Sequence, residues 1–308
     1  QTFIDNAEPM ATRQMPDDEG GMLRQFIPAR LDDNPTMAKD DPGYEARLSG
    51  LGSPALVKVM RDGDWNVVDG AYFEEWDQRK HVLRPVELPR YWLRFRSMDW
   101  GSASPFSVGW WALTSEAWQH PDGRLIPKGA LIRYREWYGA KSANVGLKLT
   151  TEQVAQGIKD REKGEDIAYG VLDPSAFAQD GGPSHADRMA LLGVYFGKAQ
   201  NARVSSRGNQ GGWDQVRSRL VGDNVRPMLY LFSTCKDLIR TLPAIQHDPN
   251  RPEDLDTTAE DHALDSMRYG CVSQPYMPPT EDKSLRDRYQ QTKERLRSTG
   301  STNGWMTA

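Results

Sequence analysis

Two aspartates lie four positions apart in a segment that begins acidic and turns apolar, Pro252 to Tyr269. A helix capped by Thr257 or Thr258 would place Asp261 and Asp265 one turn apart on the same face. Like charges at that spacing repel each other, so an offsetting positive partner is expected. Hard divalent cations such as Mg2+ prefer carboxylate oxygens, and the pair therefore predicts one side of a metal site.

Two further aspartates follow predicted strands. Asp99 ends an aromatic-rich pattern over residues 91–98, and Asp173 ends an apolar pattern over residues 167–172. Two cations roughly 3.5–4 Å apart can activate a water and stabilise the leaving oxygen in phosphodiester hydrolysis. The protein has only to hold these ions with carboxylates. Two strands and a helix that each supply aspartates therefore predict a phosphodiesterase that uses two Mg2+ or Mn2+ ions.

The four aspartates are given separate roles in this prediction. Asp99 is expected to bridge both ions, because the end of a central strand gives it a rigid base. Asp173 would hold one ion, and Asp265 or Asp261 would hold the other, with Asp265 favoured. His262 is expected to be an outer ligand, a proton shuttle or a cap residue.

Each assignment has a structural alternative. An aspartate at a strand end is commonly a turn or cap residue, and Asp173-Pro174 is a frequent turn pair. Asp261 or Asp265 could pair with Arg268, which stands three residues after Asp265.

Composition restricts the class of protein. The chain has 308 residues and a net charge of −4. That charge argues against a protein that coats nucleic acid by bulk attraction, although a local basic groove is compatible with it. The only two cysteines, Cys235 and Cys271, lack a metal-ligand spacing and are expected to be buried, reduced thiols. No apolar run approaches the ~18 residues of a membrane span, so a cytoplasmic location without a membrane partner is expected.

The order of elements indicates an α/β fold with a mixed sheet flanked by helices. Residues 1–88 read as short, mostly helical pieces, and residues 277–308 as a charged, flexible tail. Between them, residues 89–276 alternate strands and helices. The predicted strands are 91–99, 106–113, 131–138, 167–172 and 228–232, and the predicted helices are 151–163, 187–197, 213–220 and 234–242.

The chain resembles the large terminase subunit of tailed bacteriophages from about Phe26 to Tyr276. The resemblance is carried by Phe26-Ile27-Pro28-Ala29-Arg30, Asp33-Asn34-Pro35, Tyr44 to Leu51, Gly63-Asp64-Trp65, Met98-Asp99-Trp100-Gly101, Asp173-Pro174 and Glu253 to Tyr269. It implies that residues 89–276 form an RNase H-like (RuvC-type) nuclease domain. It also implies that residues 1–88 are the tail of an ATPase domain with the interdomain linker. No Gly-x-x-x-x-Gly-Lys-Ser/Thr motif is present, so no ATPase activity is expected of this chain.

The resemblance also implies partners. They are double-stranded DNA and, in the full motor, the portal and the small terminase subunit, in the cytoplasm of an infected cell. The isolated chain is expected to be monomeric, because the family forms its ring on the portal and largely through ATPase domains. Candidate DNA contacts are Lys141, Lys148, Arg203 and Arg207, for which solvated loops are the alternative.

Three functions compete at this point. The favoured one is a metal-dependent endonuclease that cuts concatemeric double-stranded DNA during genome packaging. The first alternative is a non-enzymatic module that grips DNA and docks on the portal. The second is another RNase H-fold nuclease, such as a Holliday-junction resolvase.

Overall fold

The computed structural model describes residues 70–277 except 180, 207–209 and 224, and isolated positions between 10 and 43. Few of the positions expected to form the mostly helical N-terminal segment are therefore described, and the tail after residue 277 lies outside the described residues. The described N-terminal positions include two short antiparallel strands, β1 (Thr12–Gln14) and β2 (Leu23–Gln25). The sequence did not indicate them.

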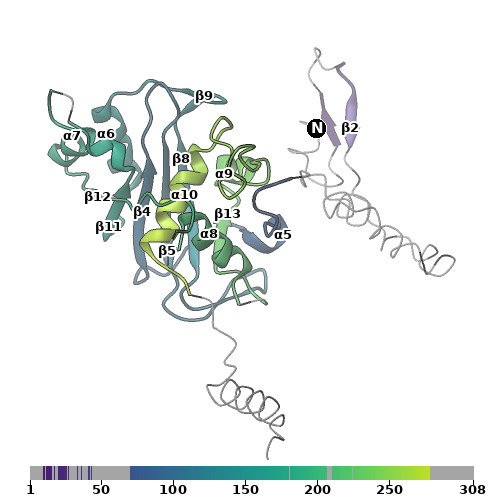
Figure 1. The fold of residues 1–308 in the computed structure, drawn as a ribbon. Coiled ribbons are helices and arrows are strands. Elements are labelled where there is room, and N and C mark those ends of the chain that lie inside the picture. The colour runs from purple at the N-terminus through teal and green to yellow at the C-terminus, as the bar shows by residue number, and fades with distance from the viewer. Residues whose placement is uncertain are drawn as a thin grey trace, which may run out of the picture.

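A seven-stranded mixed sheet organises the described chain (Figure 1). Its strand order is β12-β11-β4-β5-β8-β13-β3. The strands are β3 (Val82–Leu83), β4 (Leu93–Asp99), β5 (Ser107–Leu113), β8 (Leu131–Tyr138), β11 (Tyr169–Leu172), β12 (Gly197–Lys198) and β13 (Leu229–Phe232).

The connections of these strands confirm the predicted RNase H-like class. β4, β5 and β8 form an antiparallel meander, and β11 returns to lie parallel to β4 on its outer side. β12 then extends the sheet parallel to β11, whereas β13 adds on the opposite side, parallel to β8. The carboxyl ends of β4 and β11 consequently lie side by side at one edge of the sheet.

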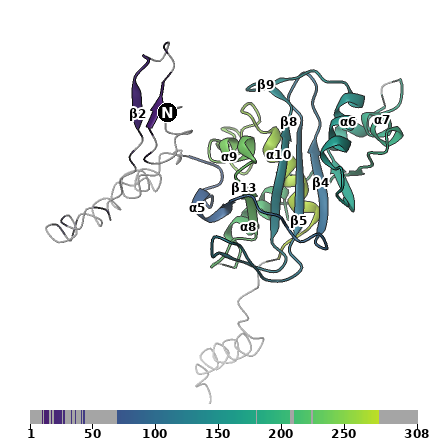
Figure 2. The same ribbon diagram turned by 180° about the vertical axis from the view of Figure 1, so that it is seen from behind.

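Helices cover both faces of the sheet (Figures 1 and 2). The side chains of β4 alternate between these two faces. Phe95 belongs to the core shared with α8 (Gly212–Val221), α9 (Lys236–Thr241) and α10 (His262–Ser273). Met98 faces the other way and packs with α6 (Thr151–Arg161) and α7 (His185–Leu191). Ser97 and Asp99 stand two and four residues after Phe95, so their side chains point to the same face of the sheet and toward α10.

Smaller elements complete the described fold. They are α5 (Gln78–His81), the hairpin of β6 (Trp118–Gln119) and β7 (Leu125–Ile126), the hairpin of β9 (Ala140–Ser142) and β10 (Val145–Gly146), and the 3-10 helix η3 (Pro174–Phe177). Both cysteines, Cys235 and Cys271, are buried free thiols, as the sequence predicted. Among the described residues, no helix combines the length and the apolar character needed to cross a bilayer.

The segment ahead of α5 packs into the sheet's main core. Tyr72, Phe73 and Trp76 are buried there, and β3 pairs with β13 as the last strand of the sheet. Residues 72–83, which the sequence assigns to the N-terminal segment 1–88, thus pack with the strands and helices of the predicted domain 89–276.

Candidate functional site

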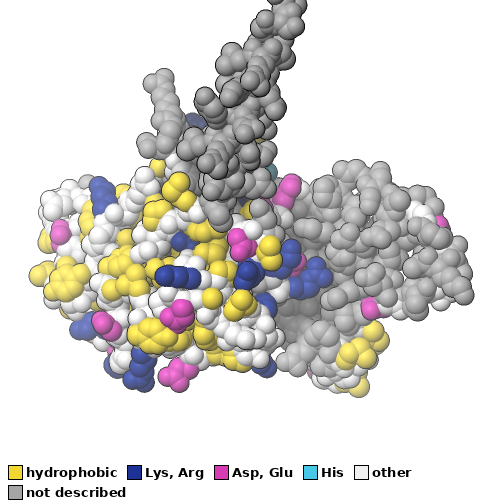
Figure 3. Space-filling view, turned by 90° about the horizontal axis from the view of Figure 1, so that it is seen from below, with side chains coloured by type: hydrophobic (Ala, Val, Ile, Leu, Met, Phe, Trp, Pro, Cys, Tyr) yellow, Lys and Arg dark blue, Asp and Glu magenta, His cyan; other side chains and the backbone are white. Residues whose placement is uncertain are grey.

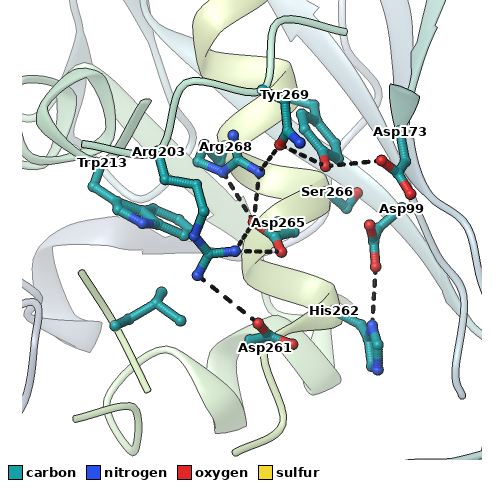
Figure 4. A network of polar contacts seen from close by, with 12 residues as sticks. Asp99, Asp173, Arg203, Trp213, Asp261, His262, Asp265, Ser266, Arg268 and Tyr269 are labelled. Carbon is teal, nitrogen blue, oxygen red and sulfur yellow. Dashed lines mark hydrogen bonds and ion pairs between the residues drawn. The ribbon is translucent and has the colours of Figure 1, made fainter. Parts of the chain in front are cut away.

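Asp99 is the last residue of β4 and lies beside the first turn of α10 (Figure 4). Only 7% of the residue is exposed. The His262 Nδ1–H donates to Asp99 Oδ2 over 2.9 Å, which joins the strand end to the first turn of α10. Asp99 is therefore a buried carboxylate with an imidazole partner, at the position that the sequence predicted.

Asp173 lies beside Asp99, because the Asp173 backbone N–H donates to the Met98 carbonyl over 3.0 Å. Its carboxylate caps η3, accepting from the Ser175 backbone N–H (3.1 Å) and from the Ser175 hydroxyl. The hydroxyl of Tyr269, on α10, lies 3.4 Å from Asp173 Oδ1 (Figure 4). The turn role considered from the sequence is thus present, and the carboxylate also faces α10.

Two serines dock α10 onto β4. The Ser97 hydroxyl donates to the Ser266 carbonyl over 2.6 Å, and the Ser266 hydroxyl donates to the Ser97 carbonyl over 3.2 Å. The Trp111 indole N–H also donates to the Ser97 oxygen over 2.8 Å. These buried bonds bring the adjacent Asp265 to the side of the sheet edge that carries Asp99.

The start of α10 differs from the prediction. Its N-cap is Asp261, and the Asp265 backbone N–H donates to the Asp261 carbonyl over 2.9 Å. The expected cap at Thr257 or Thr258 is wrong, because Asp256 accepts bonds from the Thr258 N–H and hydroxyl in a turn ahead of the helix. Asp261 and Asp265 still lie one turn apart.

Two arginines, Arg203 and Arg268, donate hydrogen bonds to the carboxylate of Asp265 (Figure 4). The Arg268 Nε–H donates to Asp265 Oδ1 over 2.9 Å, which realises the i,i+3 pairing weighed from the sequence. Arg203, predicted as a DNA contact, donates from Nη1 to both Asp265 oxygens, over 3.3 and 3.0 Å. Its Nη2 lies 4.0 Å from Asp261 Oδ2. Arg203 thus lies on the acidic cluster.

The acids repel one another in a buried setting. Burial raises the pKa of Asp99 to about 7, and the charges of Asp265 and Asp173 add to the rise, against the opposing effect of His262. Burial also raises the pKa of Asp261 to about 6, with a contribution from Asp265. The pKa of His262 rises despite its burial, because of its hydrogen bond to Asp99 and the surrounding carboxylates. Such a cluster favours the binding of added positive charge.

The chemistry of these donors suits a hard divalent cation, since carboxylate oxygens and one imidazole make up the set. Within the described residues, however, no three His, Cys, Asp or Glu side chains stand close enough together to hold a metal ion. Arg203, Arg268 and Ser175 engage the carboxylate oxygens instead. Ion binding at this site would require the carboxylates to leave these partners and turn toward one another.

The other candidate DNA contacts lie on or beside the β9–β10 hairpin. Lys141 and Lys148 are exposed, and the Lys148 backbone N–H donates to the Ser102 carbonyl over 3.1 Å, in the loop that follows Asp99. Arg207 lies outside the described residues. Seen from below, the described surface mixes hydrophobic, basic and acidic side chains, so that face has no single sign of charge (Figure 3).

Sequence reasoning missed the polar surroundings of the acids. Asp254, to which the sequence analysis gave no role, accepts from the Arg203 Nε–H over 3.0 Å and from the Trp213 indole N–H over 2.8 Å. Asn201 accepts from the Arg268 Nη2–H over 2.9 Å. Asp254 lies in the quoted acidic segment, but nothing in the pattern there indicates an arginine partner.

A scan of protein-family models finds no match for this chain, and a search of curated proteins finds none. Solved structures do match. The large terminase from a thermophilic bacteriophage is 20% identical, with a TM-score of 0.50 over 83% of this chain and 57% of that chain. A structure of the same terminase in complex with ATP-gamma-S gives 21% identity and a TM-score of 0.51, with the same coverage.

The nuclease domain of the P22 large terminase is 16% identical over 66% of this chain and 92% of that chain, with a TM-score of 0.46. This chain spans a little over half the length of the thermophilic phage terminase that it matches. Over that span, the chain has the fold of a large terminase.

Proposed function

We propose that this chain contains the nuclease region of a large terminase subunit and hydrolyses phosphodiester bonds in double-stranded DNA. The observation that carries the proposal is that β4, β11 and the start of α10 bring four aspartates to one edge of an RNase H-like sheet, although no three of them are grouped closely enough to hold an ion. Two of them, Asp99 and Asp261, have pKa values raised to about 7 and about 6. Raised carboxylate pKa values at a shared site are typical of catalytic and metal-binding positions.

Asp99, Asp173, Asp265 and Asp261 are the residues that would hold two Mg2+ or Mn2+ ions, with His262 as an outer ligand. When bound, such ions supply a nucleophilic water and charge stabilisation for phosphodiester hydrolysis. Asp99 is the central carboxylate, because it adjoins Asp173 through the sheet and His262 through a hydrogen bond.

His262 has a second task in this proposal. Its Nδ1–H is committed to Asp99, which fixes the ring and leaves Nε2 to accept or release a proton. The side chain is 21% exposed, so exchange of that proton with solvent is open. A ring held in this way can move a proton at the site without changing its position.

DNA and motor partners follow from the same proposal. Lys141 and Lys148 would contact phosphates, since both are exposed on the side of the loop that follows Asp99. The portal and the small terminase subunit would be partners of the complete motor in the cytoplasm of an infected cell. The isolated chain would be monomeric.

A non-enzymatic role as a DNA-gripping or portal-docking module is the second candidate. One observation favours it: among the described residues, no three potential ligands are grouped closely enough for a metal ion. An acidic cluster neutralised by Arg203 and Arg268 could be a purely structural device.

Plasmid cleavage distinguishes the two candidates. The wild-type chain should nick supercoiled DNA with Mn2+ or Mg2+ and not with EDTA. Asp99→Asn should reduce the rate by orders of magnitude, because it removes the central charge at nearly constant shape. Asp160→Asn, which changes an exposed aspartate paired with Lys163, is the matched control and should cleave like wild type. Equal cleavage by folded Asp99→Asn protein would exclude the proposed site.

A further inference from the structure

Arg203 places its guanidinium among the carboxylates of Asp254, Asp261 and Asp265, of which Figure 4 shows the latter two. The Nε–H donates to Asp254 Oδ1 and Oδ2, over 3.0 and 3.1 Å. The Nη1–H groups donate to both oxygens of Asp265, and Nη2 lies 4.0 Å from Asp261 Oδ2. One positive charge therefore lies close to both Asp261 and Asp265 and offsets their mutual repulsion.

Two residues outside α10, Asp254 and Trp213, also contact Arg203. Its guanidinium carbon lies 5.1 Å from the centre of the Trp213 ring, whose indole N–H donates to Asp254 over 2.8 Å. The Arg203 side chain is 22% exposed. Arg203 thus has an anchor, Asp254 with Trp213, which does not depend on Asp261 or Asp265.

The contact with Asp261 is incomplete. Arg203 Nη2 is shielded from solvent and has no hydrogen-bond partner among the described residues, although it lies 4.0 Å from Asp261 Oδ2. A buried donor without an acceptor is unfavourable, and native proteins rarely keep one without a reason. The Nη2 group of Arg203 is therefore held less firmly than its Nε–H, which is bonded to Asp254.

We propose that Arg203 is a resident counter-cation of Asp261 and Asp265, in addition to Arg268 on Asp265, and competes with the divalent cation that these two aspartates would bind. The inference rests on the proposed function, because it concerns the helix-side ion of that site. An ion bound by both carboxylates needs the oxygens and the space that the Nη1 and Nη2 groups occupy. The guanidinium has to withdraw, while its Nε–H remains on Asp254.

This competition makes the two ion positions unequal. Asp99 and Asp173 make no hydrogen bond or ion pair with an arginine among the described residues, so an ion there displaces no arginine; the basic partner of Asp99 is His262. The helix-side ion must break the Arg203–Asp265 pair, which lowers its affinity relative to a site without the arginine. Removing the arginine should therefore strengthen one binding event and leave the other unchanged.

Calorimetric titration with Mn2+, backed by electron paramagnetic counting of bound ions, tests this directly. The wild-type chain should bind one ion tightly and a second weakly. Arg203→Gln should tighten the second event by at least about tenfold and change the first by less than about twofold. Arg188→Gln is the matched control, since it also removes one arginine from a two-bond pair, with Glu152, away from the acidic cluster.

Arg203→Lys gives a second measurement if Arg203→Gln fails to fold. A lysine retains the charge but not the planar fork, so the second event should tighten by a few fold. Wild-type binding constants in both Arg203 variants would overturn the inference and leave the nuclease proposal standing. Absence of Mn2+ binding to wild type and variants alike would overturn both.

Discussion

At the level of a single residue, the proposed role of Asp99 as a metal ligand opposes the effect of its surroundings. A metal ligand has to be ionised, yet burial and neighbouring acids raise the pKa of this carboxyl from 3.8 to about 7. Between these pH values Asp99 therefore binds more protons in the folded chain without metal than in the unfolded chain. The contribution of this one residue to the free energy of unfolding falls as the pH rises from about 4 to 7.

Replacement of this residue should consequently stabilise the metal-free protein. At pH 8, Asp99→Asn should unfold at higher urea concentration than wild type in EDTA, by as much as about 4 kcal/mol. The asparagine oxygen can still accept from His262, so the hydrogen bond survives. Added Mn2+ should stabilise wild type and leave the variant unchanged. A variant less stable than wild type at pH 8 would contradict this account.

Metal affinity should depend on pH for the same reason. Below pH 6, both Asp99 and Asp261 carry protons that an ion has to displace, because their pKa values are about 7 and about 6. Apparent Mn2+ affinity should therefore rise steeply from pH 5.5 to about 7 and then level off. Titrations at one-unit pH intervals measure this, and an affinity that is flat across the range would exclude proton competition.

At the scale of elements, the docking of α10 on the sheet positions the site. The helix approaches β5 so closely that a Cβ at Gly270 would lie 2.8 Å from Cε2 and Nε1 of Trp111. That indole also donates to Ser97, which bonds to Ser266. Glycine at this position therefore allows the close approach on which the placement of Asp265 depends.

Gly270→Ala tests that dependence. Alanine normally favours a helix over glycine, but here the added methyl group overlaps Trp111, so we expect a loss of about 1–3 kcal/mol. Mn2+ affinity should fall as well, because α10 carries Asp261 and Asp265. Gly182→Ala is the control, since nothing lies within 4 Å of its Cβ, and it should behave like wild type. A stabilised Gly270→Ala protein would refute the close-packing argument.

Long apolar elements were predictable from sequence, and short ones were not. The strand predicted over 131–138 coincides with β8, and the helix predicted over 151–163 is α6, which ends two residues earlier. Strong periodicity and the capping box at Thr150 account for this. In contrast, β12 has two residues and falls where the predicted helix 187–197 ends, because its pairing with β11 is set by tertiary contacts.

The candidate site divides in the same way. Asp99 and Asp173 were placed by the strands that precede them, since a strand end is visible in local sequence. Arg203 is separated by about fifty residues from Asp254 and about sixty from Asp265, and its loop has no periodic pattern. Which carboxylates an arginine contacts depends on how distant segments pack, and no local pattern reports that.

At the scale of the whole molecule, the packed unit extends farther toward the N-terminus than its sequence pattern indicates. Tyr72 is buried, its backbone N–H donates to the Ile245 carbonyl over 2.8 Å, and its hydroxyl donates to the Glu253 carbonyl over 2.6 Å. Glu253 precedes Asp254, the anchor of Arg203. The segment ahead of α5 is thus part of the support of the site.

Two fragments should therefore differ sharply. A chain of residues 70–277 should fold cooperatively, whereas residues 89–277 would lose Tyr72, Phe73 and Trp76 and leave β13 as an open edge. Losing a single buried aromatic side chain typically costs about 3–5 kcal/mol, so the shorter fragment should be unfolded or aggregated. Thermal unfolding and light scattering compare the two. Equal melting temperatures would place the boundary at residue 89 after all.

The two buried thiols, Cys235 and Cys271, have a practical consequence for site-specific labelling of the chain. Burial raises the pKa of Cys235 to about 12 and that of Cys271 to about 11, so neither forms a thiolate at neutral pH. Maleimide reagents should therefore leave the native chain unlabelled. A cysteine introduced at an exposed position, such as Lys141 on the β9–β10 hairpin, would then be the specific attachment point for a fluorophore or spin label, without prior removal of native cysteines.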